Sequence, residues 1–121
     1  MKTDEETLLE LSQRLIDSIA DGDWQIYESL CAPELTAFEP EALGHRVEGL
    51  PFHRYYFDLG APAGARNETM VDPRVQLLGK DAALVTYMRL TQHQTDAGPV
   101  SRRCEETRVW LREVATLDGT M

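Results

Sequence analysis

The chain has 121 residues, of which 42% are hydrophobic, so it can form a single compact core and is too short for two. Its 21 acidic residues outnumber the 12 basic residues, and a formal net charge of -9 opposes binding to phosphate backbones or anionic membranes. We therefore expect one domain over residues 1–121, with neither nucleic acid nor membrane as a partner.

The start of the chain is charged and has no apolar run typical of a signal peptide, and no later window approaches the roughly 18 apolar residues of a membrane span. Cys31 and Cys104 are far apart and lack the spacing of metal ligands. We expect them to be buried thiols of a cytoplasmic protein, with a disulfide between them as the alternative. No metal and no cofactor is expected.

A long amphipathic helix is predicted at the amino terminus. Thr3 and Glu6 form a capping-box pattern, and apolar residues then recur at steps of three and four positions. This periodicity predicts a helix over residues 4–20. Gly22 follows it as a left-handed cap that would end the helix.

A second, shorter helix is predicted over residues 24–30. Asp23 can cap its start, and Pro33 prevents its continuation. Tyr27 lies in this helix and has two interpretations, a packing aromatic or a hydroxyl group that faces a pocket.

The next segment mixes aromatic and charged residues. A short strand is predicted over residues 35–38, stopped by Pro40, and a second extended piece is predicted around Val47. Pro51 suits the first position of a further helix. In that helix, spacings of three and four residues predict one aromatic face, with His53 and Arg54 pointing elsewhere. The residues of that face are Phe52, Tyr55, Tyr56 and Leu59.

The second half of the chain is predicted to be a β-meander. The sequence GAPAGARN at residues 60–67 has no period and marks an exposed loop. Three long antiparallel strands then follow over 69–78, 82–95 and 100–113. Pro73 lacks a backbone N–H group, so the first of these strands is expected to be an edge strand or to carry a bulge.

Early helices followed by long strands predict an α+β fold with a bent antiparallel sheet around the first helix. Strand alternation places Arg89 and Arg108 among half-buried residues. Either they pair with nearby carboxylates, or both guanidinium groups converge on the concave face to form a site for a carboxylate. The carboxylates available for pairing are Glu39, Glu41, Glu105 and Glu106.

Three motifs carry a family resemblance. The segment LTAFEPEALGHRVEGLPFHRYYF at 35–57, MRLTQ around Arg89 and EETRVW around Arg108 closely resemble the association, or hub, domain of calcium/calmodulin-dependent protein kinase II. The resemblance implies a cone-shaped, cystatin-like α+β fold of the nuclear transport factor 2-like type. It also implies a non-catalytic module that assembles kinase subunits into a dodecamer- or tetradecamer-like double ring, with a kinase domain in the parent chain.

The resemblance further implies a pocket that accepts a small carboxylate or a peptide. The matching residues are Tyr27, His53, Arg89 and Arg108. Two departures stand against this pocket. The loop after Phe57, DLGAPAG, lacks a large aromatic residue. The final segment VATLDGTM also does not match the last strand of the family, which carries another pocket arginine, so that strand is expected to be missing.

Two other functions are compatible with a cone fold of this type. His53 with Glu39 or Glu41 could act as an acid and base beside the two arginines of an enzyme. Alternatively, the chain could be a module that binds small carboxylates without converting them. Self-association is the leading hypothesis, because the chain has more aromatic residues between 52 and 57 than a small core needs.

Overall fold

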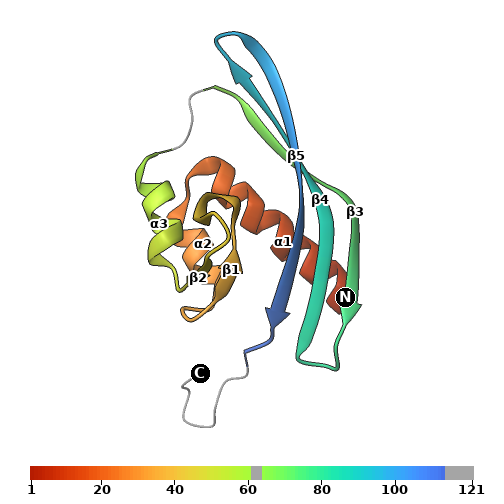
Figure 1. Cartoon of the computed structure of the whole chain (residues 1–121). Helices are drawn as coiled ribbons and strands as arrows, with labels where there is room; N and C mark the ends of the chain where they lie inside the picture. Colours follow the sequence, from red (N-terminus) through yellow and green to blue (C-terminus); the bar gives the residue numbers. More distant parts are fainter. Residues whose placement is uncertain (61–63, 114–121) are drawn as a thin grey trace.

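The computed structural model describes residues 1–60 and 64–113, and it confirms the predicted α+β class (Figure 1). In chain order the elements are α1 (Asp4–Asp21), α2 (Trp24–Leu30), β1 (Thr36–Phe38), the 3-10 helix η1 (Pro40–Ala42), β2 (Arg46–Glu48), α3 (Pro51–Asp58), β3 (Arg66–Leu77), β4 (Ala82–Thr95) and β5 (Gly98–Leu111).

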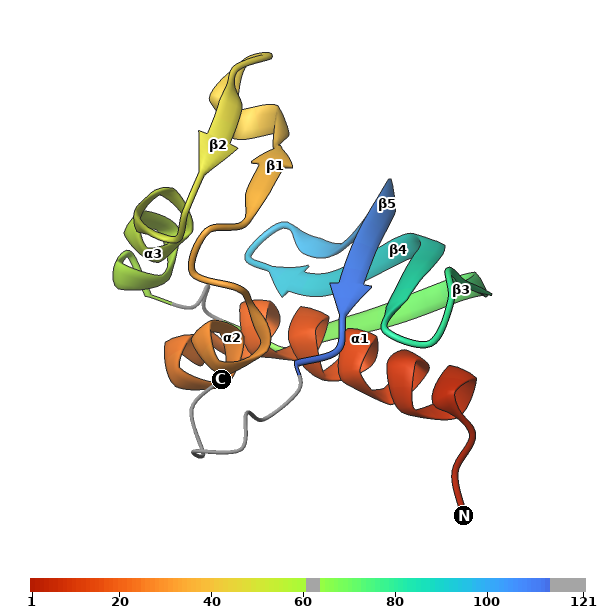
Figure 2. The ribbon, with the colours of Figure 1, turned by 90° about the horizontal axis from the view of Figure 1, so that it is seen from below.

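Helix α1 forms where the capping box predicted it. The Thr3 side chain accepts a hydrogen bond from the backbone N–H of Glu6, and Gly22 ends the helix with φ 67°. The helix lies along the sheet and contacts β3 and β4 (Figures 1 and 2). Its buried face includes Leu15 and Ile16, so the apolar stripe of the helix covers the concave side of the sheet.

Strands β3, β4 and β5 form one antiparallel meander with β4 in the centre. The register pairs Arg89 with Cys104 and Val85 with Arg108. Strand β3 lies at an edge, and its register shifts between Val71 and Arg74. Both structural consequences expected of Pro73, an edge position and a bulge, are therefore present.

The chain between α2 and α3 forms a separate two-stranded hairpin. Strands β1 and β2 pair antiparallel, with Ala37 opposite Val47, and η1 lies at the tip. Figure 2 shows this hairpin extending away from α1 and α2. Val47 is buried, whereas its neighbours on β2 are exposed, so the hairpin is anchored through one strand face.

The core lies between α1 and the sheet. Ile16, Val85 and Tyr87 form its centre, and the ring of Trp110 packs against them. Trp110 Nε1 also donates a hydrogen bond to Ser12 Oγ over 3.2 Å. This contact ties β5 to α1 across the concave face, in addition to the apolar packing.

Several predicted boundaries are corrected by the structure. Strand β3 begins at Arg66, within the segment predicted as a loop, and β5 spans Gly98–Leu111 instead of 100–113. Residues 61–63 of the predicted loop and the predicted missing last strand, at residues 114–121, lie outside the described residues. In the described part of the chain, no helix is long and apolar enough to cross a membrane.

Candidate functional site

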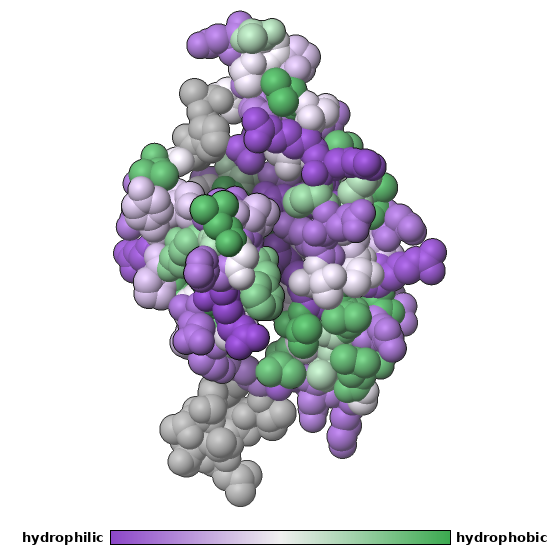
Figure 3. Space-filling view, viewed as in Figure 1, coloured by the Kyte–Doolittle hydropathy of each residue, from purple (hydrophilic) through white to green (hydrophobic). Residues whose placement is uncertain are grey.

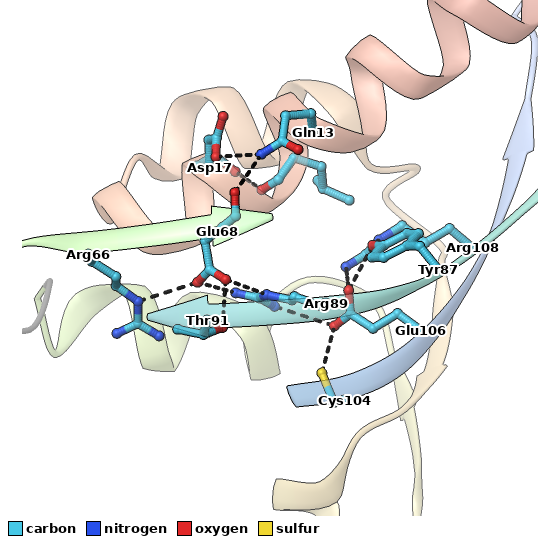
Figure 4. Close-up of polar contacts among 12 residues, drawn as sticks. Gln13, Asp17, Arg66, Glu68, Tyr87, Arg89, Thr91, Cys104, Glu106 and Arg108 are labelled. Atoms are coloured by element: carbon cyan, nitrogen blue, oxygen red, sulfur yellow. Dashed lines mark hydrogen bonds and ion pairs between the residues drawn. The ribbon is translucent and has the colours of Figure 1, made fainter. Parts of the chain in front are cut away.

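The carboxylate of Glu68 is fully buried among the described residues, with a side chain that is 0% exposed. Arg89 Nε donates to its Oε2 over 3.1 Å, and Arg89 Nη2 donates to its Oε1 over 3.0 Å (Figure 4). Thr91 Oγ1 donates a third hydrogen bond of 2.6 Å. The bidentate pairing and the threonine together satisfy a carboxylate that burial alone would disfavour.

Glu106 joins Arg89 to Arg108. It accepts hydrogen bonds from Arg89 Nη1 over 3.3 Å and from Arg108 Nη2 over 3.2 Å. Tyr87 Oη donates to Glu106 over 2.7 Å and accepts from Arg108 Nε over 2.7 Å. We call Glu68, Tyr87, Arg89, Glu106 and Arg108 the concave ion-pair network.

The network shifts the pKa values of its members in consistent directions. Burial raises the pKa of Glu68, but hydrogen bonds from Arg89 and Thr91 outweigh it and hold that pKa below its ordinary value. Glu106 behaves in the same way, because the charge of Arg108 and the Tyr87 hydroxyl oppose the effect of burial on its pKa. Burial raises the pKa of Tyr87 to about 12. The two glutamates and the two arginines of the network are therefore charged at neutral pH.

A second group of aromatic residues adjoins this network. The rings of Tyr27 and His53 lie 5.8 Å apart, and those of Tyr27 and Phe57 lie 4.9 Å apart. Burial raises the pKa of Tyr27, nearby Cys31 raises it further, and the charge of Arg108 opposes both effects. The ring contacts of Tyr27 pack α2 against α3.

The structure brings the four predicted site residues together in two pairs. His53 packs against Tyr27, and Arg108 shares Glu106 with Arg89. The guanidinium group of Arg89 is, however, directed at Glu68. Arg66 Nε also donates to Glu68 Oε1 over 3.3 Å, and Arg108 pairs with Glu106, so the guanidinium groups that could bind a free carboxylate already have carboxylate partners within the chain.

The acid and base pair considered for an enzyme is also in place. His53 Nε2 lies 2.9 Å from Glu39 Oε1, whereas Glu41 forms no hydrogen bond or ion pair with either of them in the described part of the chain. Both cysteines are free thiols, but the prediction that they are buried is wrong, because Cys31 is half-buried and Cys104 on β5 is exposed. Within residues 1–60 and 64–113, no group of three or more histidine, cysteine or acidic residues is arranged to hold a metal ion.

Glu68 is the functional residue that the sequence interpretation missed. It falls between the predicted loop at 60–67 and the predicted strand at 69–78, whereas it lies inside β3 opposite Thr91. The available signal was strand alternation, because Glu68 and Met70 are two positions apart and their side chains therefore share a face. Extending the predicted strand to Arg66 would have included Glu68 in it, although its position beside Arg89 also depends on the register shift between Val71 and Arg74.

The aromatic face predicted for α3 is mostly on the outside. Tyr55, Tyr56 and Leu59 are exposed, whereas His53 and Phe57 turn inward against α2. Exposed apolar residues also lie at the end of the sheet near the end of β5, where a hydrophobic area is visible at the lower right of Figure 3. Those residues are Leu77, Leu78, Val109 and Leu111.

Comparison with solved structures first defines the fold. A putative ketosteroid isomerase from Shewanella frigidimarina superposes with a TM-score of 0.65 at 16% identity, covering 92% of this chain and 85% of that chain. This likeness shows a shared cone-shaped fold and nothing about activity. The association domain of C. elegans CaMKII superposes with a TM-score of 0.85 at 40% identity, covering 90% of this chain and 84% of that chain.

The sequence comparisons then define the family. The calcium/calmodulin dependent protein kinase II association domain matches residues 4–116, and this chain belongs to that family. The delta subunit of calcium/calmodulin-dependent protein kinase type II from Oryctolagus cuniculus is 42% identical over 115 residues, which are 93% of this chain. The match covers 22% of that subunit, so this chain spans about a fifth of its relative's length.

Family membership confirms three predictions made from the sequence. The resemblance to the association domain is correct, as is the nuclear transport factor 2-like fold. The chain is an association module of a non-catalytic family, not an enzyme. The number of subunits and the residues of a ligand pocket are matters for proposal.

Proposed function

We propose that this chain assembles copies of itself into a closed double ring of twelve or fourteen subunits, as a single association domain that spans residues 1–121. The family match over residues 4–116 carries this proposal. A closed ring is the arrangement in which every subunit uses the same two contact surfaces and none is left uncovered.

The surface of the subunit supports assembly. Phe38 and Leu43 on the β1–β2 hairpin are 70% and 86% exposed, and Val109 and Leu111 are exposed at the end of β5. These residues form two separate apolar areas, on the hairpin and on the sheet. Apolar areas that the core of a subunit does not cover are typical of protein interfaces, and two of them suit a ring with two kinds of contact.

The proposed biological role follows from the arrangement of a ring. If a kinase domain accompanies this module in its parent chain, a ring holds many such domains within a few nanometres of one another. The second encounter between tethered domains is then intramolecular and occurs at a high effective concentration. The ring would promote phosphorylation between neighbours without any chemistry of its own.

Native mass spectrometry of the purified chain at micromolar concentration tests the proposal. The expected result is a narrow distribution at twelve or fourteen times the subunit mass. A dilution series is the control, because a specific ring keeps its stoichiometry until it dissociates, whereas an aggregate changes size continuously. A monomer or a simple dimer at every concentration would contradict the ring.

The carboxylate or peptide pocket at Tyr27, His53, Arg89 and Arg108 is a separate proposal. It is supported by the packing of His53 against Tyr27 and by the carboxylate of Glu106 that Arg89 and Arg108 share, and it is opposed by the pairing of Arg89 with Glu68. Calorimetric titration with a simple hydroxy acid should release heat with the wild-type protein and none with Arg108→Met. Absence of both heat and a thermal shift in the wild type would refute it.

A further inference from the structure

Leu43, at the tip of the β1–β2 hairpin, destabilises a single subunit in two ways. It adopts the left-handed conformation, with φ 52° and ψ 44°, which residues other than glycine, asparagine and aspartate rarely adopt. Its side chain is also 86% exposed. A leucine in this position combines backbone strain with exposed apolar surface, so the fold of the subunit does not explain its presence.

The surroundings of Leu43 make it a projecting apolar group. The residue follows η1 at the end of the hairpin, which extends away from α1 and α2 (Figure 2). Phe38 is exposed on β1, and the guanidinium group of Arg46 lies 5.5 Å from the centre of its ring. We call Phe38, Leu43 and Arg46 the hairpin knob.

A groove of matching character lies elsewhere on the same subunit. It has a volume of about 420 Å³ and runs between α2 and α3. Its lining residues, which we call the α2–α3 groove, are Trp24, Glu28, Leu50, Pro51, Arg54, Tyr55 and Asp58. The walls are aromatic and aliphatic, and charged groups lie at the rim. This volume is ample for one leucine side chain with part of its backbone.

The charges beside the knob and the groove have complementary signs. Arg46 is basic, and among the described residues Glu28 at the groove rim forms no ion pair. Glu41 precedes Leu43 and is acidic, and Arg54, which lines the groove, has a long ion pair of 3.9 Å with Asp58 and lies over the ring of Trp24 at 5.5 Å. Two oppositely charged pairs can therefore form across a contact that places Leu43 between them.

We propose that the hairpin knob of one copy inserts Leu43 into the α2–α3 groove of the next copy. This inference rests on the proposed self-association and specifies one of its contacts. Because the knob and the groove are different surfaces, the contact is heterologous, and repeating it from copy to copy produces a ring when the rotation closes. The strain at Leu43 is then explained, since the backbone conformation directs the side chain toward a partner.

The test uses two variants that each remove one half of the contact. Leu43→Asn removes the knob, and asparagine tolerates the left-handed conformation better than leucine does. Tyr55→Ser removes one wall of the groove at a residue that is 61% exposed. Leu59→Asn is the matched control. Leu59 directly follows α3, the helix that carries Tyr55, and it is 68% exposed but does not line the groove.

Native mass spectrometry should show that Leu43→Asn and Tyr55→Ser each lose the wild-type assembly, while Leu59→Asn keeps it. Circular dichroism should show that all three variants are folded. A mixture of the two defective variants should form species that contain both and that neither forms alone. This complementation occurs because the intact knob of Tyr55→Ser still fits the intact groove of Leu43→Asn.

The outcomes separate this inference from the proposed function. If the wild type assembles and both defective variants assemble equally well, the knob and groove contact is wrong while self-association stands. If both variants dissociate and the mixture gives no joint species, the two surfaces do not bind each other. If the wild type is a monomer, self-association itself is refuted, and the contact fails with it.

Discussion

In the concave ion-pair network, four charged side chains from three strands neutralise one another inside the subunit, whereas the β1–β2 hairpin leaves Phe38 and Leu43 largely exposed. The network buries polar groups and gives them hydrogen-bond and ion-pair partners inside the subunit. The hairpin brings apolar groups outside and does not cover them. Polar groups that are costly to bury therefore have their partners within one subunit. The exposed apolar groups of the hairpin have no cover within the subunit, and a second copy could cover them.

Two arginines illustrate the difference. The side chain of Arg89 is 11% exposed and makes three hydrogen bonds of 3.0 to 3.3 Å to carboxylates. Arg54, which lines the α2–α3 groove, is 58% exposed, with one ion pair of 3.9 Å and a cation–π contact of 5.5 Å to the ring of Trp24. A buried pair is costly to break, whereas an exposed pair contributes little, so Arg89 serves folding while Arg54 is free to serve recognition.

The largest expected effect is on the buried side of this comparison. Glu68→Gln keeps the shape of the side chain and leaves Arg89 with Glu106 as its remaining charged partner. We expect the free energy of unfolding to fall by about 3 kcal/mol, the low end of the range for breaking a buried pair. Chemical denaturation at one fixed protein concentration measures it, since assembly makes the apparent stability depend on concentration.

Two control variants sharpen that prediction. The double variant Glu68→Met with Arg89→Met removes both charges and should recover most of the loss, because apolar residues of similar volume replace a buried pair at little cost. Glu10→Gln removes the exposed ion pair between Glu10 and Lys2, which spans 2.6 Å, and should cost less than about 1 kcal/mol. Equal losses of unfolding free energy in Glu68→Gln and Glu10→Gln would show that the buried network contributes no more to stability than an exposed ion pair does.

Acid should weaken the same network progressively. The pKa values of Glu68 and Glu106 are lower in the folded subunit than the value of about 4.3 for an unperturbed glutamate. Each carboxylate therefore contributes stability that is fully present above that unfolded pKa and is lost as the pH falls through its lower folded pKa. Denaturation midpoints measured from pH 7 downward should decline below about pH 4, and less steeply in Glu68→Gln. A decline of equal slope in both proteins would contradict this assignment.

The local elements were predictable because their signals lie within a few residues. The capping box at Thr3 and Gly22 bound α1 closely, and Pro73 indicated both the edge position and the bulge of β3. The family motifs predicted the fold class and the association role, which the comparisons confirm. Contacts across strands were harder to predict. Glu68 pairs with Arg89 through a register that depends on the bulge near Asp72, and no local pattern determines that register.

The orientation of α3 was not predictable for a related reason. The helix has eight residues, and aromatic side chains surround most of it, so periodicity alone allowed more than one buried face. The observed face is selected by Trp24 and Tyr27 of α2, whose rings lie 5.2 and 4.9 Å from that of Phe57. Tertiary packing therefore decided which aromatics became core and which remained on the surface.

The smallest expected effect concerns the exposed side of the comparison and has the opposite sign. In protein diluted until it is monomeric, Leu43→Asn should raise the free energy of unfolding by about 1 kcal/mol, because asparagine adopts the left-handed conformation more readily than leucine. Leu59 has φ -70°, so Leu59→Asn relieves no such strain and should produce no gain. Urea denaturation of the dilute monomers measures both. A loss of stability in Leu43→Asn would mean that Leu43 packs within its own subunit. A gain, together with loss of assembly at higher concentration, would mean that the chain keeps a strained, exposed leucine for the sake of its partner.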